Sequence, residues 1–107
     1  MKPQNLFSPL PAAVPEEIFT TLLQGPQFTL ERIVSDGQAT PVGEWYDQET
    51  HEWVLLLNGS AGLVFEGETE ECVLHPGDYI HIPAHQRHRV AWTDGRQKTV
   101  WLAVHYR

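Results

Sequence analysis

The sequence predicts an all-β fold, a sandwich or barrel of many short strands, preceded by an N-terminal arm and a short helix. From residue 28 onward, short apolar runs follow one another closely and are separated by turn residues. The dipeptides Asp36-Gly37, Asn58-Gly59 and Asp94-Gly95 lie between such runs, and Asn-Gly is the strongest short hairpin signal. A length of 107 residues fits one small domain.

The first 26 residues are predicted to lie outside the barrel, which takes residues 27–107. Residues 1–14 are rich in proline and lack periodicity, so we expect an extended arm. Residues 15–25 begin with Pro15 and two glutamates, end on Gly25, and place Ile18 and Leu22 on one apolar stripe. Proline at the start, acids in the first turn and a terminal glycine are typical of a short helix. This helix would have to dock on the barrel to persist.

The barrel strands are predicted from apolar runs bounded by turns. In residues 52–57, Glu52, Val54 and Leu56 share one face, and the opposite face is apolar too, so both faces should be covered. We expect one face to line the barrel and the other to meet the helix, the arm or a second subunit. A domain this small would gain from dimerisation, so we expect a homodimer. A carboxylate on the inward face needs a partner. The predicted strands are residues 28–34, 42–46, 52–57, 61–65, 71–75, 79–82, 87–92 and 99–106.

The charge balance and the cysteine content exclude some classes of partner and location. Seven Lys and Arg against fourteen Asp and Glu give a net charge of −7, which argues against nucleic acid and anionic membranes. The single cysteine, Cys72, rules out an internal disulfide and is typical of a reducing compartment. No signal peptide is visible, and no window approaches the about 20 apolar residues of a membrane span. We therefore expect a cytoplasmic protein.

Two segments resemble the signature motifs of the cupin superfamily. The second cupin motif has glycine, proline and histidine at the spacing of Gly77, Pro83 and His88, and His85 stands where the family has its second glycine. The first motif ends in a glutamate and, seven positions later, a glycine, which match Glu52 and Gly59. The resemblance implies a cupin-type jelly-roll β-barrel, and most often a dimer.

The first motif departs from the family pattern where two histidines should precede Glu52. The matching positions are Tyr46 and Gln48, or Trp45 and Asp47, depending on the gap. In a typical cupin those histidines, the glutamate and the second motif's histidine bind one divalent metal. The resemblance therefore implies Mn, Fe, Ni or Zn held by a reduced ligand set. The candidate ligands are Gln48, Glu52 and His88, with Asp47, His51 and His85 as further candidates.

The barrel interior is the predicted binding pocket for a small molecule. His88 shares its strand parity with Val90 and Trp92, and Val54 shares a face with Glu52. The predicted pocket residues are Tyr46, Val54, Val90 and Trp92. The facing of His105, in the last strand, stays open. We expect a metal-dependent enzyme of dioxygenase or isomerase type; the alternative is a metal-free binding, sensor or accessory cupin without catalysis.

Overall fold

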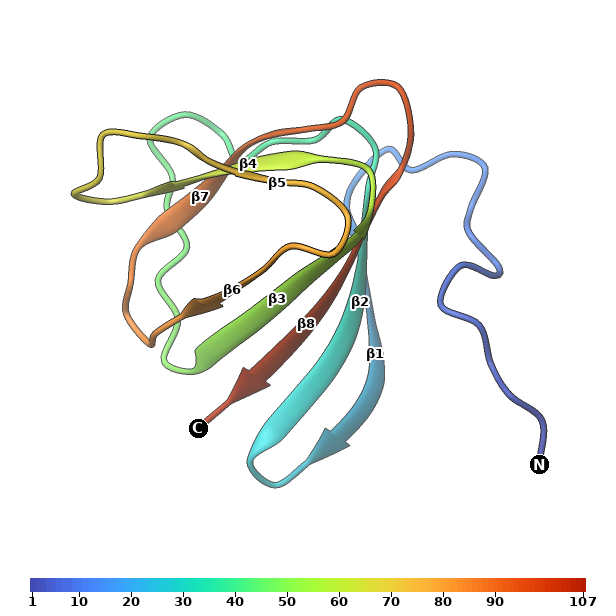
Figure 1. Cartoon of the computed structure of the whole chain (residues 1–107). Coiled ribbons are helices and arrows are strands. Elements are labelled where there is room, and N and C mark those ends of the chain that lie inside the picture. The colour runs from blue at the N-terminus through green and yellow to red at the C-terminus, as the bar shows by residue number, and fades with distance from the viewer.

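The computed structural model describes all residues, 1–107, and contains eight strands and no helix. All strand pairs are antiparallel, in a five-stranded sheet of order β1-β2-β8-β3-β6 and a three-stranded sheet of order β5-β4-β7. The two sheets face each other, and the N-terminal arm lies outside them on the side of β1 (Figure 1). The strands are β1 (Ile18–Gly25), β2 (Phe28–Ser35), β3 (His51–Asn58), β4 (Ala61–Phe65), β5 (Cys72–Leu74), β6 (Tyr79–Ile82), β7 (His88–Thr93) and β8 (Thr99–Tyr106).

The core lies between the two sheets. Along β3, Glu52, Val54 and Leu56 are buried, so the predicted inward face is confirmed. The outward face is half-buried, and Trp53 packs on Tyr79 of β6 with ring centroids 5.4 Å apart. No segment forms a helix that is long and apolar enough to cross a membrane. The predicted all-β class is confirmed, and its strands form two antiparallel sheets.

The predicted short helix is wrong, because residues 18–25 form strand β1. This strand pairs with β2 from Ile18 opposite Val34 to Gly25 opposite Phe28, with a bulge at Leu22. Gly25 therefore closes a hairpin with β2 and does not end a helix. A short helix is marginal on its own, whereas pairing with β2 satisfies the backbone groups on one side of the whole segment and joins it to the sheet. The homodimer stays a prediction.

The predicted strand at residues 42–46 is also wrong. This segment is irregular, and only Tyr46 forms an isolated bridge, with His88. The Tyr46 amide donates to the His88 carbonyl at 2.7 Å, and the His88 amide donates back at 3.1 Å. The connection between β2 and β3 is thus fixed to β7 beside His88, and Thr40 forms a second attachment through its amide, which donates to the Val90 carbonyl at 2.8 Å.

Candidate functional site

A cavity opens between the two sheets, with a volume of about 530 Å³ that includes its open mouth. Both sheets contribute to its wall, and the loop before β3 adds Tyr46 and Gln48. Eight of the fourteen lining residues are hydrophobic. The lining residues are Glu17, Phe19, Glu31, Ile33, Tyr46, Gln48, Glu52, Val54, Leu63, Ile82, His88, Val90, Trp101 and His105.

His88 begins β7 and turns its imidazole into this cavity. Its Nδ1 lies 2.8 Å from the Gln86 backbone carbonyl, which only accepts, so Nδ1 carries a proton. Nε2 then faces the Glu52 carboxylate at 3.6 Å. The ring of Tyr46 stacks against the imidazole with centroids 5.6 Å apart. Packing and the backbone hydrogen bond together fix which nitrogen points toward Glu52.

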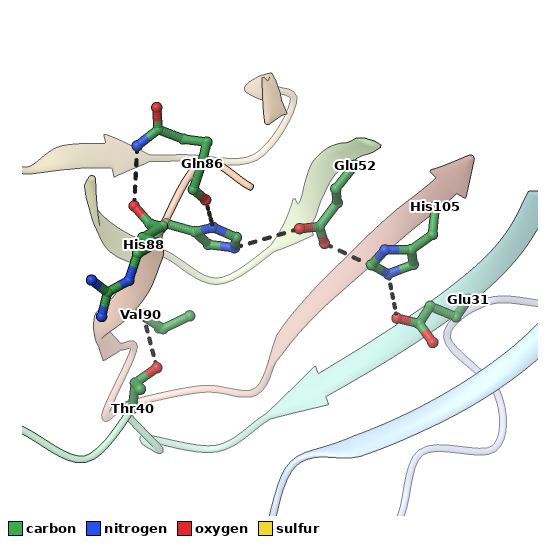
Figure 2. Close-up of polar contacts among 8 residues, drawn as sticks. Glu31, Thr40, Glu52, Gln86, His88, Val90 and His105 are labelled. Atoms are coloured by element: carbon green, nitrogen blue, oxygen red, sulfur yellow. Dashed lines mark hydrogen bonds and ion pairs between the residues drawn. The ribbon is translucent and has the colours of Figure 1, made fainter. Parts of the chain in front are cut away.

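Glu52 lies between two imidazoles (Figure 2). It is 7% exposed, and its Oε1 faces His88 while its Oε2 lies 3.8 Å from Nε2 of His105. Both separations exceed the length of a good hydrogen bond. The carboxylate therefore has two cationic or donor neighbours at ion-pair distance and retains lone pairs for a group of a bound molecule.

His105 and Glu31 extend the cluster by a second pair. His105 Nε2 lies 2.9 Å from Glu31 Oε1, and both side chains are mostly buried. His105 stands opposite Glu52 in the pairing of β3 with β8. The structure thus gives His105, whose facing the sequence left open, an inward position, and it adds Glu31, which the sequence analysis missed. The usable signal was the alternation of Glu31 and Ile33 with Arg32 along β2.

The comparisons with known proteins agree with this architecture. A family model described as the cupin domain matches residues 33–105. The chain belongs to the cupin family. A crystal structure from Ralstonia eutropha JMP134, of a protein provisionally named a mannose-6-phosphate isomerase, is 54% identical, with 99% of this chain and 98% of that chain covered and a TM-score of 0.95.

More distant structures share the cupin fold. A cupin superfamily protein from Desulfitobacterium hafniense DCB-2 is 18% identical, with 91% of this chain and 83% of that chain covered and a TM-score of 0.73. The polyketide cyclase RemF from Streptomyces resistomycificus is 25% identical, with 86% and 66% covered and a TM-score of 0.72. No curated protein sequence matches this chain.

The further metal-ligand candidates of this cupin lie away from Glu52. Asp47 and His85 pair with each other at 2.9 Å, and both are largely exposed. His85 has a φ of 64°, a left-handed conformation that suits the glycine found there in the family motif. His51 accepts a hydrogen bond from the Ala84 amide at 3.0 Å and packs beside Tyr106, 5.2 Å between centroids. None of these three residues lines the cavity.

Three of the four predicted pocket residues line the cavity, and one does not. Tyr46, Val54 and Val90 line the cavity, and Trp92 does not. In the pairing of β4 with β7, Gly62 faces Trp92 and Leu63 faces Val90, so Ala91 is an extra residue in the ladder. This bulge breaks the alternation on which the expectation for Trp92 rested. The Trp92 indole instead donates to the Glu71 carboxylate.

The donor set does not fit the metal centre that the family pattern implies. Gln48, Glu52 and His88 all line the cavity, but no group of three or more His, Cys, Asp or Glu side chains is arranged to hold a metal ion. Asp47 and His85, which could have completed a set, are occupied with each other at the surface. The inward acids and imidazoles form instead an alternating series of Glu31, His105, Glu52 and His88 (Figure 2).

The carboxylates favour protonated imidazoles in this series. Burial lowers the pKa of His88, but the neighbouring Glu52 carboxylate and the hydrogen bond with the Gln86 carbonyl outweigh that effect, and the pKa is raised. The hydrogen bond with Glu31 raises the pKa of His105, against an opposing effect of burial. Burial, and then the charge of Glu17, raise the pKa of Tyr46, so its phenol stays protonated.

We expect the free energy of unfolding to fall as pH rises above about 6.5, the ordinary pKa of histidine. Since both imidazoles have raised pKa values in the folded state, their contribution is fully present below that pH and is lost as pH rises through the folded values. Urea denaturation at a series of pH values measures this slope. A His88→Gln, His105→Gln double variant should flatten it, and His75→Gln, at an exposed position, should not. Equal slopes in all variants would contradict this account.

Proposed function

We propose that this cupin binds a small molecule in the barrel cavity and that Glu52 and His88 act on it as a hydrogen-bonding and proton-exchanging pair, without a resident metal. One observation carries the proposal. Glu52 is a buried carboxylate that faces an open, mostly apolar cavity and stands just beyond hydrogen-bond distance from two imidazoles. Small-molecule sites typically combine such apolar walls with a few convergent polar groups.

The tautomer of His88 supports a role in proton exchange. Because Nδ1–H is held by the Gln86 carbonyl, Nε2 is the nitrogen that gains or releases a proton, and it lies inside the cavity. Glu52 stabilises the protonated ring, as a carboxylate does for a catalytic imidazole. A proton moved between two positions of a bound molecule is the chemistry of an isomerase. The provisional isomerase name of the Ralstonia eutropha JMP134 protein supports this reaction class.

A divalent metal is the second candidate, because Gln48, Glu52 and His88 line one cavity. A histidine that donates Nδ1–H to a backbone carbonyl is also the usual arrangement for a metal ligand. The metal-free proposal is favoured because no three His, Cys, Asp or Glu side chains are grouped to hold a metal ion.

Two measurements on the purified protein test the proposal. Elemental analysis should find metal well below one equivalent per chain. Titration with mixtures of small fragments, followed by NMR of the ¹⁵N-labelled protein, should shift the Gln48 side-chain amide and the Trp101 indole, which line the cavity. The indoles of Trp53 and Trp92 lie outside the cavity and serve as internal controls.

The outcomes separate the alternatives. Stoichiometric metal that disappears in Glu52→Gln would replace the proposal with the metal centre. Fragments that leave Gln48 and Trp101 unmoved, or that shift the two control indoles equally, would remove the cavity as a binding site.

A further inference from the structure

The cavity wall contains acids but no strong base. Three carboxylates line it, those of Glu17, Glu31 and Glu52, and none of the lining residues is lysine or arginine. His88 and His105, even with both rings protonated, balance only two of the three charges. The cavity therefore retains at least one negative charge whatever the state of its imidazoles.

The unbalanced carboxylate belongs to Glu17, immediately before β1. None of the ion pairs in the structure includes it. It accepts a hydrogen bond from the Ser35 hydroxyl at 2.8 Å, and the Trp101 indole donates to the same hydroxyl at 3.2 Å. The Ser35 hydroxyl, itself held by the Trp101 indole, fixes the position of the Glu17 carboxylate. Because the hydroxyl is neutral, it leaves the charge of Glu17 uncompensated.

Two aromatic side chains line the cavity together with Glu17. Phe19, 54% exposed, comes two residues later in the chain and also lines the cavity. Tyr46 lines it from the loop before β3, and the charge of Glu17 contributes to the raised pKa of its phenol. A carboxylate beside aromatic faces is the combination that attracts an organic ammonium group.

The arginines of nearby strands are engaged elsewhere. Arg87 and Arg89 flank His88 in the chain but lie over the ring of Trp45, 5.6 and 5.8 Å from its centroid. Arg87 also pairs with Glu66 at 2.7 Å. Arg32, between two cavity residues of β2, donates to the carbonyl of Leu6 in the arm at 3.1 Å. No guanidinium is available to meet an anion inside the cavity.

We propose that the cavity takes a small organic cation, an amine whose ammonium group docks between Glu17 and Tyr46 at the mouth, and that it rejects phosphorylated molecules. The inference rests on the proposed function, since it names the charge class of that same ligand. The ammonium group supplies the positive partner that the Glu17 carboxylate lacks. The body of the ligand packs on the apolar wall toward Glu52. A phosphate dianion would face three carboxylates, and the two imidazolium rings that line the cavity are already paired with Glu31 and Glu52. The sugar phosphate in the name of the Ralstonia eutropha JMP134 protein therefore does not suit this cavity.

A series of ligands matched in size and differing in charge tests this inference. Benzylamine, benzyl alcohol and benzyl phosphate are titrated separately, with mannose 6-phosphate as a fourth ligand, and the Gln48 and Trp101 signals are followed by NMR. We expect benzylamine to bind about tenfold more tightly than benzyl alcohol, because only the amine can form an ion pair with Glu17 and that pair is partly solvated. We expect no saturable shift from either phosphate. The preference for the amine should shrink as salt is added.

Two neighbouring glutamates provide the matched variants. Glu17→Gln should remove the tenfold preference for the amine and leave alcohol binding unchanged. Glu16→Gln alters the same formal charge at an exposed residue that does not line the cavity, and it should keep the preference.

Equal binding of amine and alcohol, tighter binding of a phosphate, or equal effects of the two variants would each overturn the inference. So would the absence of binding by the whole series. If other, uncharged or anionic fragments still shift Gln48 and Trp101, the proposed binding cavity stands and only its charge class is wrong.

Discussion

Replacing Gly59 by alanine is expected to lower the free energy of unfolding by about 2–5 kcal/mol. Gly59 has a φ of 86°, and a left-handed backbone costs an L-residue about 1–2 kcal/mol. The added Cβ would also overlap the Thr99 hydroxyl and come within 2.8 Å of its Cα, which belongs to the backbone of β8 and cannot move freely. Such overpacking typically adds about 1–3 kcal/mol. Urea denaturation measures the loss as a lower midpoint at an unchanged slope.

Gly77→Ala is the matched control for this prediction. Gly77 has a similar φ of 94°, but a Cβ there would meet nothing within 4 Å. Its replacement should cost only the backbone strain, about 1–2 kcal/mol. If the two variants lose the same stability, the close approach of β8 to the turn contributes nothing and the first prediction fails.

Local chemistry made most of the barrel predictable. The Asn58-Gly59 turn requires a left-handed residue and lies between two apolar runs, so β3 and β4 could be placed within a residue or two. Residues 15–25 were misread because proline, acids and a terminal glycine also suit a helix start and end. The deciding interaction, pairing of β1 with β2 across a hairpin at Gly25, depends on tertiary contacts that no local pattern contains.

The site was predictable only as far as its motifs extended. Glu52 and His88 stand at motif positions, and both line the cavity. His105 and Glu31 belong to no motif, and their facing depends on the register of β8 against β3 and β2. Trp92 was wrongly predicted to line the pocket because one extra residue at Ala91 reverses the alternation of side chains along β7. A bulge of this kind has no clear signal in a single sequence.

Glu52→Gln is expected to weaken binding of a cavity ligand by about tenfold to a hundredfold, while leaving the shape of the cavity nearly unchanged. The carboxylate can form a charge-assisted hydrogen bond with a bound group, and such bonds contribute about 1.5–3 kcal/mol. The same change removes the charge that raises the pKa of both His88 and His105. Both pKa values should therefore fall. NMR titration of the imidazole ring signals measures them directly, and it does so without knowledge of the natural ligand.

Glu31→Gln separates a charge effect specific to Glu52 from a general change in the cavity. Glu31 forms the hydrogen bond that most raises the pKa of His105, whereas the pKa of His88 is raised by Glu52 and Gln86. This variant should lower the pKa of His105 and should not lower that of His88, because the charge of His105 opposes protonation of His88. If both variants lowered the pKa values of His88 and His105 by the same amount, the two imidazoles would respond only to the net charge of the cavity. In that case Glu52 would have no distinct position between them, and the proton-exchanging pair would lose its structural basis.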